Sequence, residues 1–140
     1  YGDIDEDTTF ATVDLQGVTD LRVDWGGVVS INSCGIREWI LWIKKLSPEA
    51  RCKFVQCQKV VVDQMNMIRG FLPPEGQVES FFVPYYCDKC TSITSRLCNF
   101  SPELVANLSL LSQPIPCTSC GSEASFDVLE DEYFSFLKPN

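Results

Sequence analysis

Hydrophobic residues recur at helical spacing in two stretches of the N-terminal part of the chain. From about Gly35 to Leu46, GIREWILWIKKL places apolar side chains three or four positions apart, which is typical of a helix that packs one face onto a sheet. The stretch KVVVDQMNMIRGF, which begins at Lys59, has the same spacing and predicts a second helix capped near Gly70. A weaker pattern in DTTFATVDLQG predicts a short helix over residues 7–17.

Shorter apolar runs between these segments predict strands. LRVDW and GVVSI surround two glycines at positions 26–27 and predict a strand with a bend. CKFVQC (52–57) alternates polar and apolar residues, and QVESFFVPYY (77–86) predicts a further strand after the PPEG turn. Because strands alternate with helices, the sequence predicts an α/β fold with a partly parallel sheet and helices packed on it.

The composition changes at Cys87. After this point the chain contains two Cys-x2-Cys pairs that bracket a predicted helix, SPELVANLSLL, with Ser101 as its N-cap and Pro102 in its first turn. The tail SFDVLEDEYFSFLKP predicts a short strand and then a small helix. We therefore expect two domains, residues 1–86 and residues 87–140.

The two cysteine pairs are the strongest chemical signal in the chain. Cys87 and Cys90 form one pair and Cys117 and Cys120 form the other, with 26 residues between the pairs. Two residues between thiolates allow a tight turn to direct both sulfurs at one ion, and two such turns complete a tetrahedral zinc site. Gly121 suits the second turn. The pattern resembles a zinc ribbon, which implies a structural Zn²⁺ held by four thiolates with no open position for water.

Other uses of the cysteines remain open. The paired cysteines can instead form disulfides or act as redox dithiols. For Cys52, Cys57 and Cys98 we expect buried, small apolar side chains. Cys34, at the predicted start of a helix, is either an unreactive small residue or a thiol with a lowered pKa that acts as a redox switch.

Charge and composition exclude several classes of function. The chain carries 11 basic and 19 acidic residues, a net charge of −8, and both parts of the chain contribute −4. A chain this acidic is poorly suited to binding nucleic acid or a membrane surface, because both are negatively charged. It contains no histidine, so catalytic sites and zinc sites that use this residue are excluded. No apolar run is long enough to span a membrane. We expect no signal peptide and a cytoplasmic location, and the abrupt start YGDIDEDTTF suggests a part of a longer protein.

The segment LRVDWGGVVSINSCGIREWILWIKKL resembles the core motif of STAS domains, the superfamily of sulfate transporters and anti-sigma-factor antagonists. Asp24 and VSINSCGI match the motif by position, and CKFVQC, VVVDQMNMIRGF and VESFFV match the strand, helix and strand that follow it. The resemblance covers about Ile4 to Val83, although the first strand of the family is missing or incomplete here. It implies a small mixed sheet with helices on one side, and a bacterial protein that acts by docking and not as an enzyme.

In the antagonists, the helix that this motif opens docks a partner kinase or anti-sigma factor, and a serine or threonine before the glycine is phosphorylated. This sequence has Asn32 in place of the usual aspartate and Cys34 in place of the phospho-acceptor. Ser33 keeps a hydroxyl, which we expect to cap the helix, with phosphorylation as the alternative. The residues assigned by this resemblance to docking or switching are Asn32, Ser33, Cys34, Gly35, Arg37, Glu38 and Trp42.

The two tryptophans of the predicted helix differ in their expected roles. Trp39 lies on the packing face and is expected in the core. Trp42 lies about 60° beyond Trp39, so it belongs either to the rim of the core or to a partner contact.

These observations lead to one main hypothesis and two alternatives. The main hypothesis is a cytoplasmic, STAS-like interaction protein with an appended structural zinc ribbon. Its partner would be an anti-sigma factor, a kinase-like protein or another STAS-type protein. The alternatives are a thiol redox protein or sensor that uses its Cys-x2-Cys pairs, and a zinc ribbon that binds nucleic acid.

Overall fold

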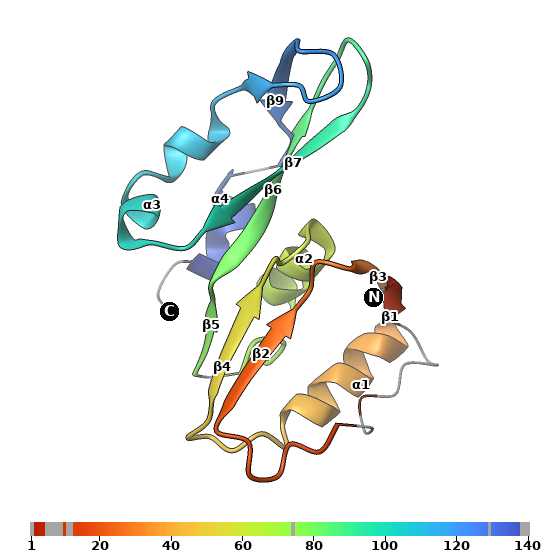
Figure 1. The fold of residues 1–140 in the computed structure, drawn as a ribbon, viewed down its shortest axis with the longest axis vertical. Coiled ribbons are helices and arrows are strands. Elements are labelled where there is room, and N and C mark those ends of the chain that lie inside the picture. The colour runs from red at the N-terminus through yellow and green to blue at the C-terminus, as the bar shows by residue number, and fades with distance from the viewer. Residues whose placement is uncertain (1, 5–9, 11–12, 74, 129, 138–140) are drawn as a thin grey trace.

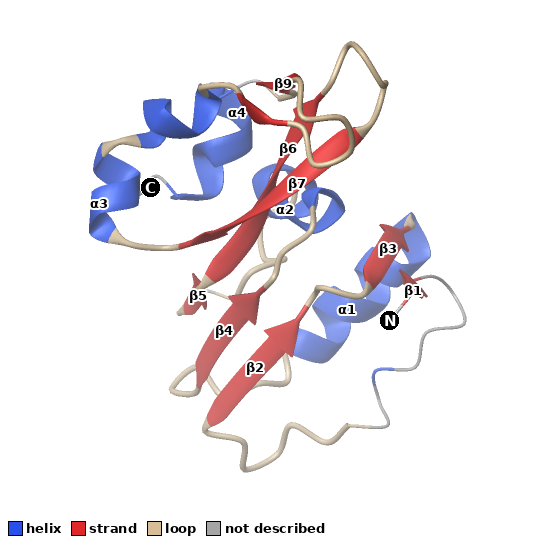
Figure 2. Ribbon diagram, turned by 45° about the horizontal axis from the view of Figure 1, so that its top comes forward, coloured by secondary structure: helices blue, strands red, loops and turns tan. Residues whose placement is uncertain are grey.

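A computed structural model describes residues 2–4, 10, 13–73, 75–128 and 130–137. These residues form a mixed α/β fold, as the sequence predicts. Figure 1 shows the strands in two groups, one at each end of the molecule. The turned view in Figure 2 places α1 beside β2 and β3, and places α3 and α4 at the other end, near β6, β7 and β9.

The first group is a parallel sheet with the strand order β2 (Asp20–Asp24), β4 (Arg51–Val55) and β5 (Gly76–Val78). Two shorter strands, β1 (Gly2–Ile4) and β3 (Val28–Ile31), form a separate parallel pair. The prediction of one bent strand around residues 26–27 is therefore wrong. A turn closed by a 3.1 Å bond from the Val28 N–H to the Trp25 carbonyl carries the chain from one sheet to the other.

The helix α1 (Ser33–Ile43) packs its apolar face against the parallel sheet. Trp39 is only 2% exposed, which confirms its predicted place in the core. Its ring lies 4.9 Å from that of Trp25 and 5.8 Å from that of Phe54 on β4, and its Nε1–H donates to the Phe71 carbonyl at 2.8 Å. Such an acceptor stabilises a buried tryptophan, because an unpaired N–H in a core is costly.

The second helix, α2 (Lys59–Met67), buries Val61 and Val62. Its C-cap is Ile68, so the prediction that Gly70 caps it is wrong. Gly70 has φ +92° and lies in the turn that follows, where its conformation is one that favours glycine. We call β2, β4, β5, α1 and α2 the parallel-sheet unit.

The second group is an antiparallel sheet in the order β7 (Ile93–Asn99), β6 (Ser80–Tyr86), β9 (Glu123–Phe126) and β8 (Ile115–Pro116). It contains two hairpins, β6–β7 and β8–β9, joined where β9 pairs with β6. We call these four strands and their turns the hairpin unit.

The two units share one extended stretch of backbone, because β5 and β6 are separated only by Glu79. The Glu79 N–H donates to the Phe54 carbonyl of β4, and its own carbonyl accepts from the Phe100 N–H, each at 2.8 Å. The predicted single strand over residues 77–86 is therefore divided between two sheets. The predicted domain boundary follows Tyr86, whereas the change of sheet occurs at Glu79.

Short helical segments complete the hairpin end of the molecule: α3 (Pro102–Ala106), a 3₁₀ turn η2 (Leu108–Ser112), α4 (Glu130–Tyr133) and a 3₁₀ turn η3 (Phe134–Leu137). The Ser101 Oγ accepts from the Leu104 N–H at 3.1 Å, which confirms the predicted cap. The predicted continuous helix of this region is divided at Asn107, whose backbone is not helical.

The predicted helix over residues 7–17 falls partly on residues outside the described set, and its described part from residue 13 onward is bend and turn. In the part of the chain that the structure describes, no helix is both long and apolar enough to cross a membrane.

Candidate metal centre

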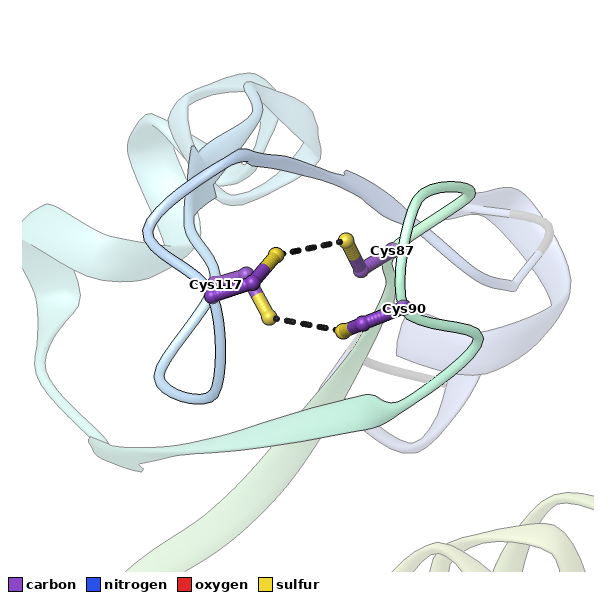
Figure 3. Close-up of side chains that lie close together, drawn as sticks. Cys87, Cys90 and Cys117 are labelled. Carbon is purple, nitrogen blue, oxygen red and sulfur yellow. Dashed lines mark hydrogen bonds between the residues drawn. The ribbon is translucent and has the colours of Figure 1, made fainter.

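The four paired cysteines lie at the tips of the two hairpins. Cys87 directly follows β6, and the turn it begins leads into β7. Cys117 directly follows β8, and its turn leads into β9. The pairing of β6 with β9 brings the two tips to the same end of the sheet, where the turns face each other (Figure 3).

The two turns have the same backbone hydrogen bonds. In the first, the Cys87 N–H donates to the Ser92 carbonyl at 3.0 Å, and the Thr91 N–H donates to the Cys87 carbonyl at 2.9 Å. In the second turn the equivalent bonds measure 2.6 Å and 2.9 Å. The residue after the second cysteine is left-handed in both, with φ 60° at Thr91 and 76° at Gly121. Each turn thereby closes on itself and directs both of its sulfurs to one side.

The four sulfur atoms all lie within 4.8 Å of one another. Two contacts cross between the turns at 3.5 Å, one from Cys87 to Cys120 and one from Cys90 to Cys117 (Figure 3). Zn–S bonds of about 2.3 Å in a tetrahedral site separate the sulfurs by about 3.8 Å. The spacing of the sulfurs therefore fits a single tetrahedral ion with four thiolate ligands.

Hydroxyl and amide donors surround these sulfurs. The Ser92 Oγ lies 2.9 Å from the Cys90 sulfur and 3.4 Å from the Cys117 sulfur, so it bridges the two turns. The Ser119 N–H donates to the Cys117 sulfur at 3.4 Å. Such donors reduce the excess negative charge of a four-thiolate site and fix its ligands in place. Ser92 and Thr91 were not among the predicted site residues, although both turns repeat the pattern Cys-x-x-Cys-x-Ser.

These donors give the thiols of the cluster different pKa values. The Ser92 hydroxyl, with the Cys120 and Ser119 N–H groups, lowers the pKa of Cys117 to about 5. The Ser122 hydroxyl and N–H lower the pKa of Cys120. The pKa of Cys87 changes in the opposite direction and is about 11. The Cys90 N–H lowers this pKa, but burial and the adjacent Cys120 and Cys90 thiols together raise it by more. The cluster thus favours thiolates at the β8–β9 tip, as a cation site requires.

The other cysteines lie apart from this centre. Cys52, Cys57 and Cys98 are buried, which confirms that prediction. Burial raises the pKa of Cys52 to about 11, and burial followed by the charge of Asp24 raises that of Cys57 to about 12, so both stay protonated and poorly nucleophilic near neutral pH. Cys34 is exposed at the start of α1.

The residues assigned to docking occupy different environments. Asn32, and not Ser33, caps α1: its Oδ1 accepts from the Gly35 N–H at 2.8 Å, so the prediction of a Ser33 cap is wrong. Asn32 has the extended backbone that a cap position needs, whereas Ser33 is already helical. Gly35 is buried against β1, where a Cβ would collide with the Ile4 carbonyl.

Trp42 belongs to the rim of the core. It is 9% exposed, its Nε1–H donates to the Val13 carbonyl at 3.0 Å, and its ring stacks on Phe10 at 5.5 Å. It therefore offers little surface to a partner. Cys34, Arg37 and Glu38 are exposed on the opposite side of the helix, together with Leu41, which is not among the predicted docking residues.

Comparison with known proteins gave no match: no family model, no curated protein and no solved structure is significantly similar to the chain. The STAS resemblance therefore rests on the sequence motif and on the order of strands and helices that follows it.

Proposed function

We propose that this protein is a non-enzymatic interaction module in which one structural Zn²⁺ joins the two hairpin tips. The observation that carries the proposal is the set of four thiols from two matching turns, all within 4.8 Å of one another. A four-thiolate site leaves no position for substrate or water, so the ion would serve to hold the fold together.

Native mass spectrometry of the purified chain tests the metal site. We expect one zinc per chain, lost on mild acidification because protons compete with the metal for thiolates. The Cys117→Ser variant should lose the ion, while Cys34→Ser, which changes an exposed thiol on α1, should retain it. A metal-free chain with disulfides between the two turns would contradict the proposal and favour the thiol redox alternative.

The proposed docking surface is the exposed face of α1. Cys34, Arg37, Glu38 and Leu41 lie at helical spacing on this face. Leu41 is 53% exposed, and an apolar side chain ringed by charged ones suits the centre of a modest protein contact. By resemblance to STAS domains, the partner would be an anti-sigma factor, a kinase-like protein or another STAS-type protein.

Binding to candidate partners of these classes tests the docking surface. We expect Leu41→Asp to abolish binding, because it places a charge at the centre of the contact. Leu110→Asp is the matched control, since Leu110 is 57% exposed and lies on η2 in the other part of the molecule. Binding that survives Leu41→Asp, or that is lost equally in both variants, would exclude the α1 face as the docking surface.

A further inference from the structure

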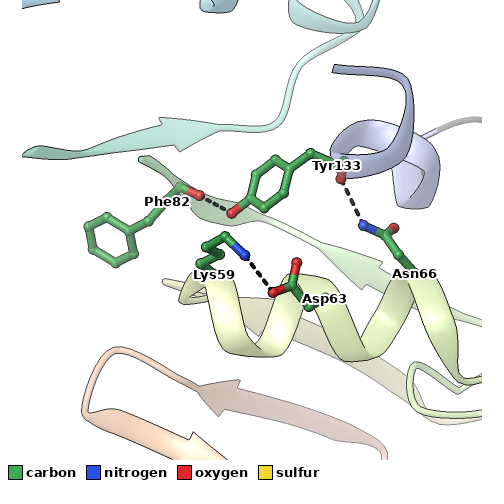
Figure 4. Close-up of polar contacts among 5 residues, drawn as sticks. All are labelled: Lys59, Asp63, Asn66, Phe82 and Tyr133. Atoms are coloured by element: carbon green, nitrogen blue, oxygen red, sulfur yellow. Dashed lines mark hydrogen bonds and ion pairs between the residues drawn. The ribbon is translucent and has the colours of Figure 1, made fainter. Parts of the chain in front are cut away.

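The segment that follows β9 returns to the parallel-sheet unit and covers part of it. We call α4 and η3, residues 130–137, the C-terminal clasp. The Tyr133 hydroxyl donates to the Phe82 carbonyl at 2.6 Å, and the Asn66 side chain on α2 donates to the Tyr133 carbonyl at 2.9 Å (Figure 4). Ser135 Oγ adds a 2.8 Å bond to the Asn66 Oδ1. The clasp thus connects α2 with β6.

The clasp also covers an aromatic side chain at the junction of the two units. Phe81 on β6 contacts the rings of Phe134 and Phe136 at 6.2 Å and 5.2 Å. Phe81 pairs with Cys98 on β7 on one side, and forms an isolated bridge with Cys57 on the other. Paired residues of neighbouring strands point to the same face of a sheet, so both thiols lie on the face that the clasp covers.

The clasp is connected to the metal centre through a short strand. β9 begins three residues after Cys120, and it pairs with β6 at only two positions and with β8 at two. Such short pairings contribute little stability by themselves. The ring of Phe126 on β9 also packs on Tyr85 at 5.9 Å and on Phe134 at 5.8 Å. The position of β9, and of the clasp that follows it, therefore depends on these contacts together with what holds the second turn against the first.

Charge adds little to the docking of the clasp on α2. An open groove beside the contact is lined by Asp63 of α2 and by Asp127 and Glu132 of the C-terminal segment. Lys59, which also lines the groove, is already paired with Asp63 at 2.7 Å (Figure 4). This ion pair leaves the α2 side of the groove without net charge, so the carboxylates of the C-terminal segment gain little electrostatic attraction to α2. The clasp is therefore held by its packing, its hydrogen bonds and the position of β9.

We propose that the ion of the four-cysteine centre holds the clasp on α2, and that loss of the ion releases the clasp while the parallel sheet stays folded. The inference rests on the proposed zinc site. If the ion is lost, release of the clasp uncovers Phe81 and the polar edge of α2. The exposed surface of the chain would therefore change with the zinc concentration.

Three buried cysteines provide built-in reporters of this release. Cys57 and Cys98 lie on the face that the clasp covers and are 0% and 6% exposed. Cys52 is equally buried at 2% exposure, but it lies on β4 between β2 and β5. Its neighbour Lys53 lines a groove with Phe136 and Leu137 of the clasp, so the Cys52 side chain points to the opposite face of the sheet. Release of the clasp therefore exposes the first two thiols, whereas unfolding of the whole chain exposes all three.

The experiment measures alkylation of each cysteine by N-ethylmaleimide, with and without a zinc chelator, by peptide mass spectrometry. We expect removal of zinc to increase the labelling rates of Cys57 and Cys98 by about tenfold or more, with Cys52 unchanged. A second variant, Phe134→Ala, should increase the same two rates with zinc still bound, because it removes a ring of the clasp and leaves the ligands intact.

The outcomes separate this inference from the proposed function. A chain that contains no zinc as purified contradicts the proposed site itself. A chain that binds zinc but shows unchanged labelling of Cys57 and Cys98 after its removal overturns the clasp inference and leaves the site standing. Equal acceleration at Cys52 also overturns it, because the loss of structure would then be global.

Discussion

The parallel-sheet unit and the hairpin unit are held together in different ways. In the parallel-sheet unit, the rings of Trp25, Trp39, Phe54 and Phe71 pack at 4.9–6.3 Å and are almost fully buried. In the hairpin unit, β8 has two residues and β9 has four. This unit has buried side chains of its own, with Val83, Tyr85 and Ala124 at 0% exposure, but its β8–β9 tip is short, and small tips of this kind commonly use a metal or disulfides. The first unit thus relies on its aromatic core, whereas the tip of the second would rely in addition on the proposed zinc ion.

The largest expected effect is the loss of a metal ligand. Cys117→Ser should abolish zinc binding and release β9 and the C-terminal clasp, while the β6–β7 hairpin stays anchored by its buried side chains. Structural zinc supplies folding free energy of about 10 kcal/mol or more in small domains, so the effect should be large. Circular dichroism should show a lower melting temperature or a separate early transition. An unchanged melting curve would mean that β9 and the clasp are held in place without a metal ion.

Loss of a core ring should affect the other unit. Phe54→Ala removes a ring that is 0% exposed and should destabilise the parallel sheet by about 3–5 kcal/mol, as large core truncations do. Zinc stoichiometry should be unchanged. Phe100→Ala is the matched control, because Phe100 is 46% exposed, and it should alter denaturant unfolding little. Loss of zinc in Phe54→Ala would show that the two units do not fold independently.

Alkaline pH should act at the junction of the units, through Cys57. Its pKa is raised from 9.0 to about 12 by burial and then by the charge of Asp24. Below pH 9 both the folded and the unfolded thiol are protonated, so stability does not depend on this group. Above pH 9 the unfolded thiol ionises while the folded one keeps its proton, and stability falls by about 1.4 kcal/mol per pH unit.

Denaturant unfolding at pH 8, 9 and 10 measures this dependence. Cys57→Ala should show a smaller loss of stability across the range than the original chain, after subtraction of its constant cost from the lost side chain. Identical slopes for the two proteins would mean that Cys57 is not protected from ionisation in the folded state.

The smallest effect concerns the start of α1. Asn32→Ala should cost about 1 kcal/mol, because it leaves the Gly35 N–H without its acceptor. Ser33→Ala should cost much less, since the Asn32 side chain already provides the cap. Equal costs in thermal unfolding would restore Ser33 as a contributor to the cap.

The sequence predicted those features that depend on local spacing. The period of apolar residues located α1 and α2, and the cysteine spacing identified a ligand set that the structure brings together. The cap was assigned to Ser33 because serine and asparagine are similarly good caps, and only backbone conformation distinguishes them. Trp42 was ambiguous because the segment that covers it, around Phe10 and Val13, has no strong pattern of its own.

Features that depend on partners distant in sequence could not be predicted in this way. The change of sheet at Glu79 is set by the carbonyl of Phe54 and the N–H of Phe100, which lie more than twenty residues to either side. The bridging position of Ser92 depends on Cys117, which belongs to the other hairpin. A pattern within one strand or turn contains no information about either contact.

The shared backbone of β5 and β6 has a consequence for the order of folding. Residues that pair in the β6–β7 hairpin are between 7 residues (Tyr86 and Ile93) and 19 residues (Ser80 and Asn99) apart, whereas Asp20 of β2 and Arg51 of β4 are 31 apart. Contacts between near neighbours form faster, because a shorter loop loses less entropy on closure. We expect the β6–β7 hairpin to form first. Because β5 continues directly into β6, the hairpin would then position β5, so the strand of the parallel sheet that comes last in the chain would be the first to be placed.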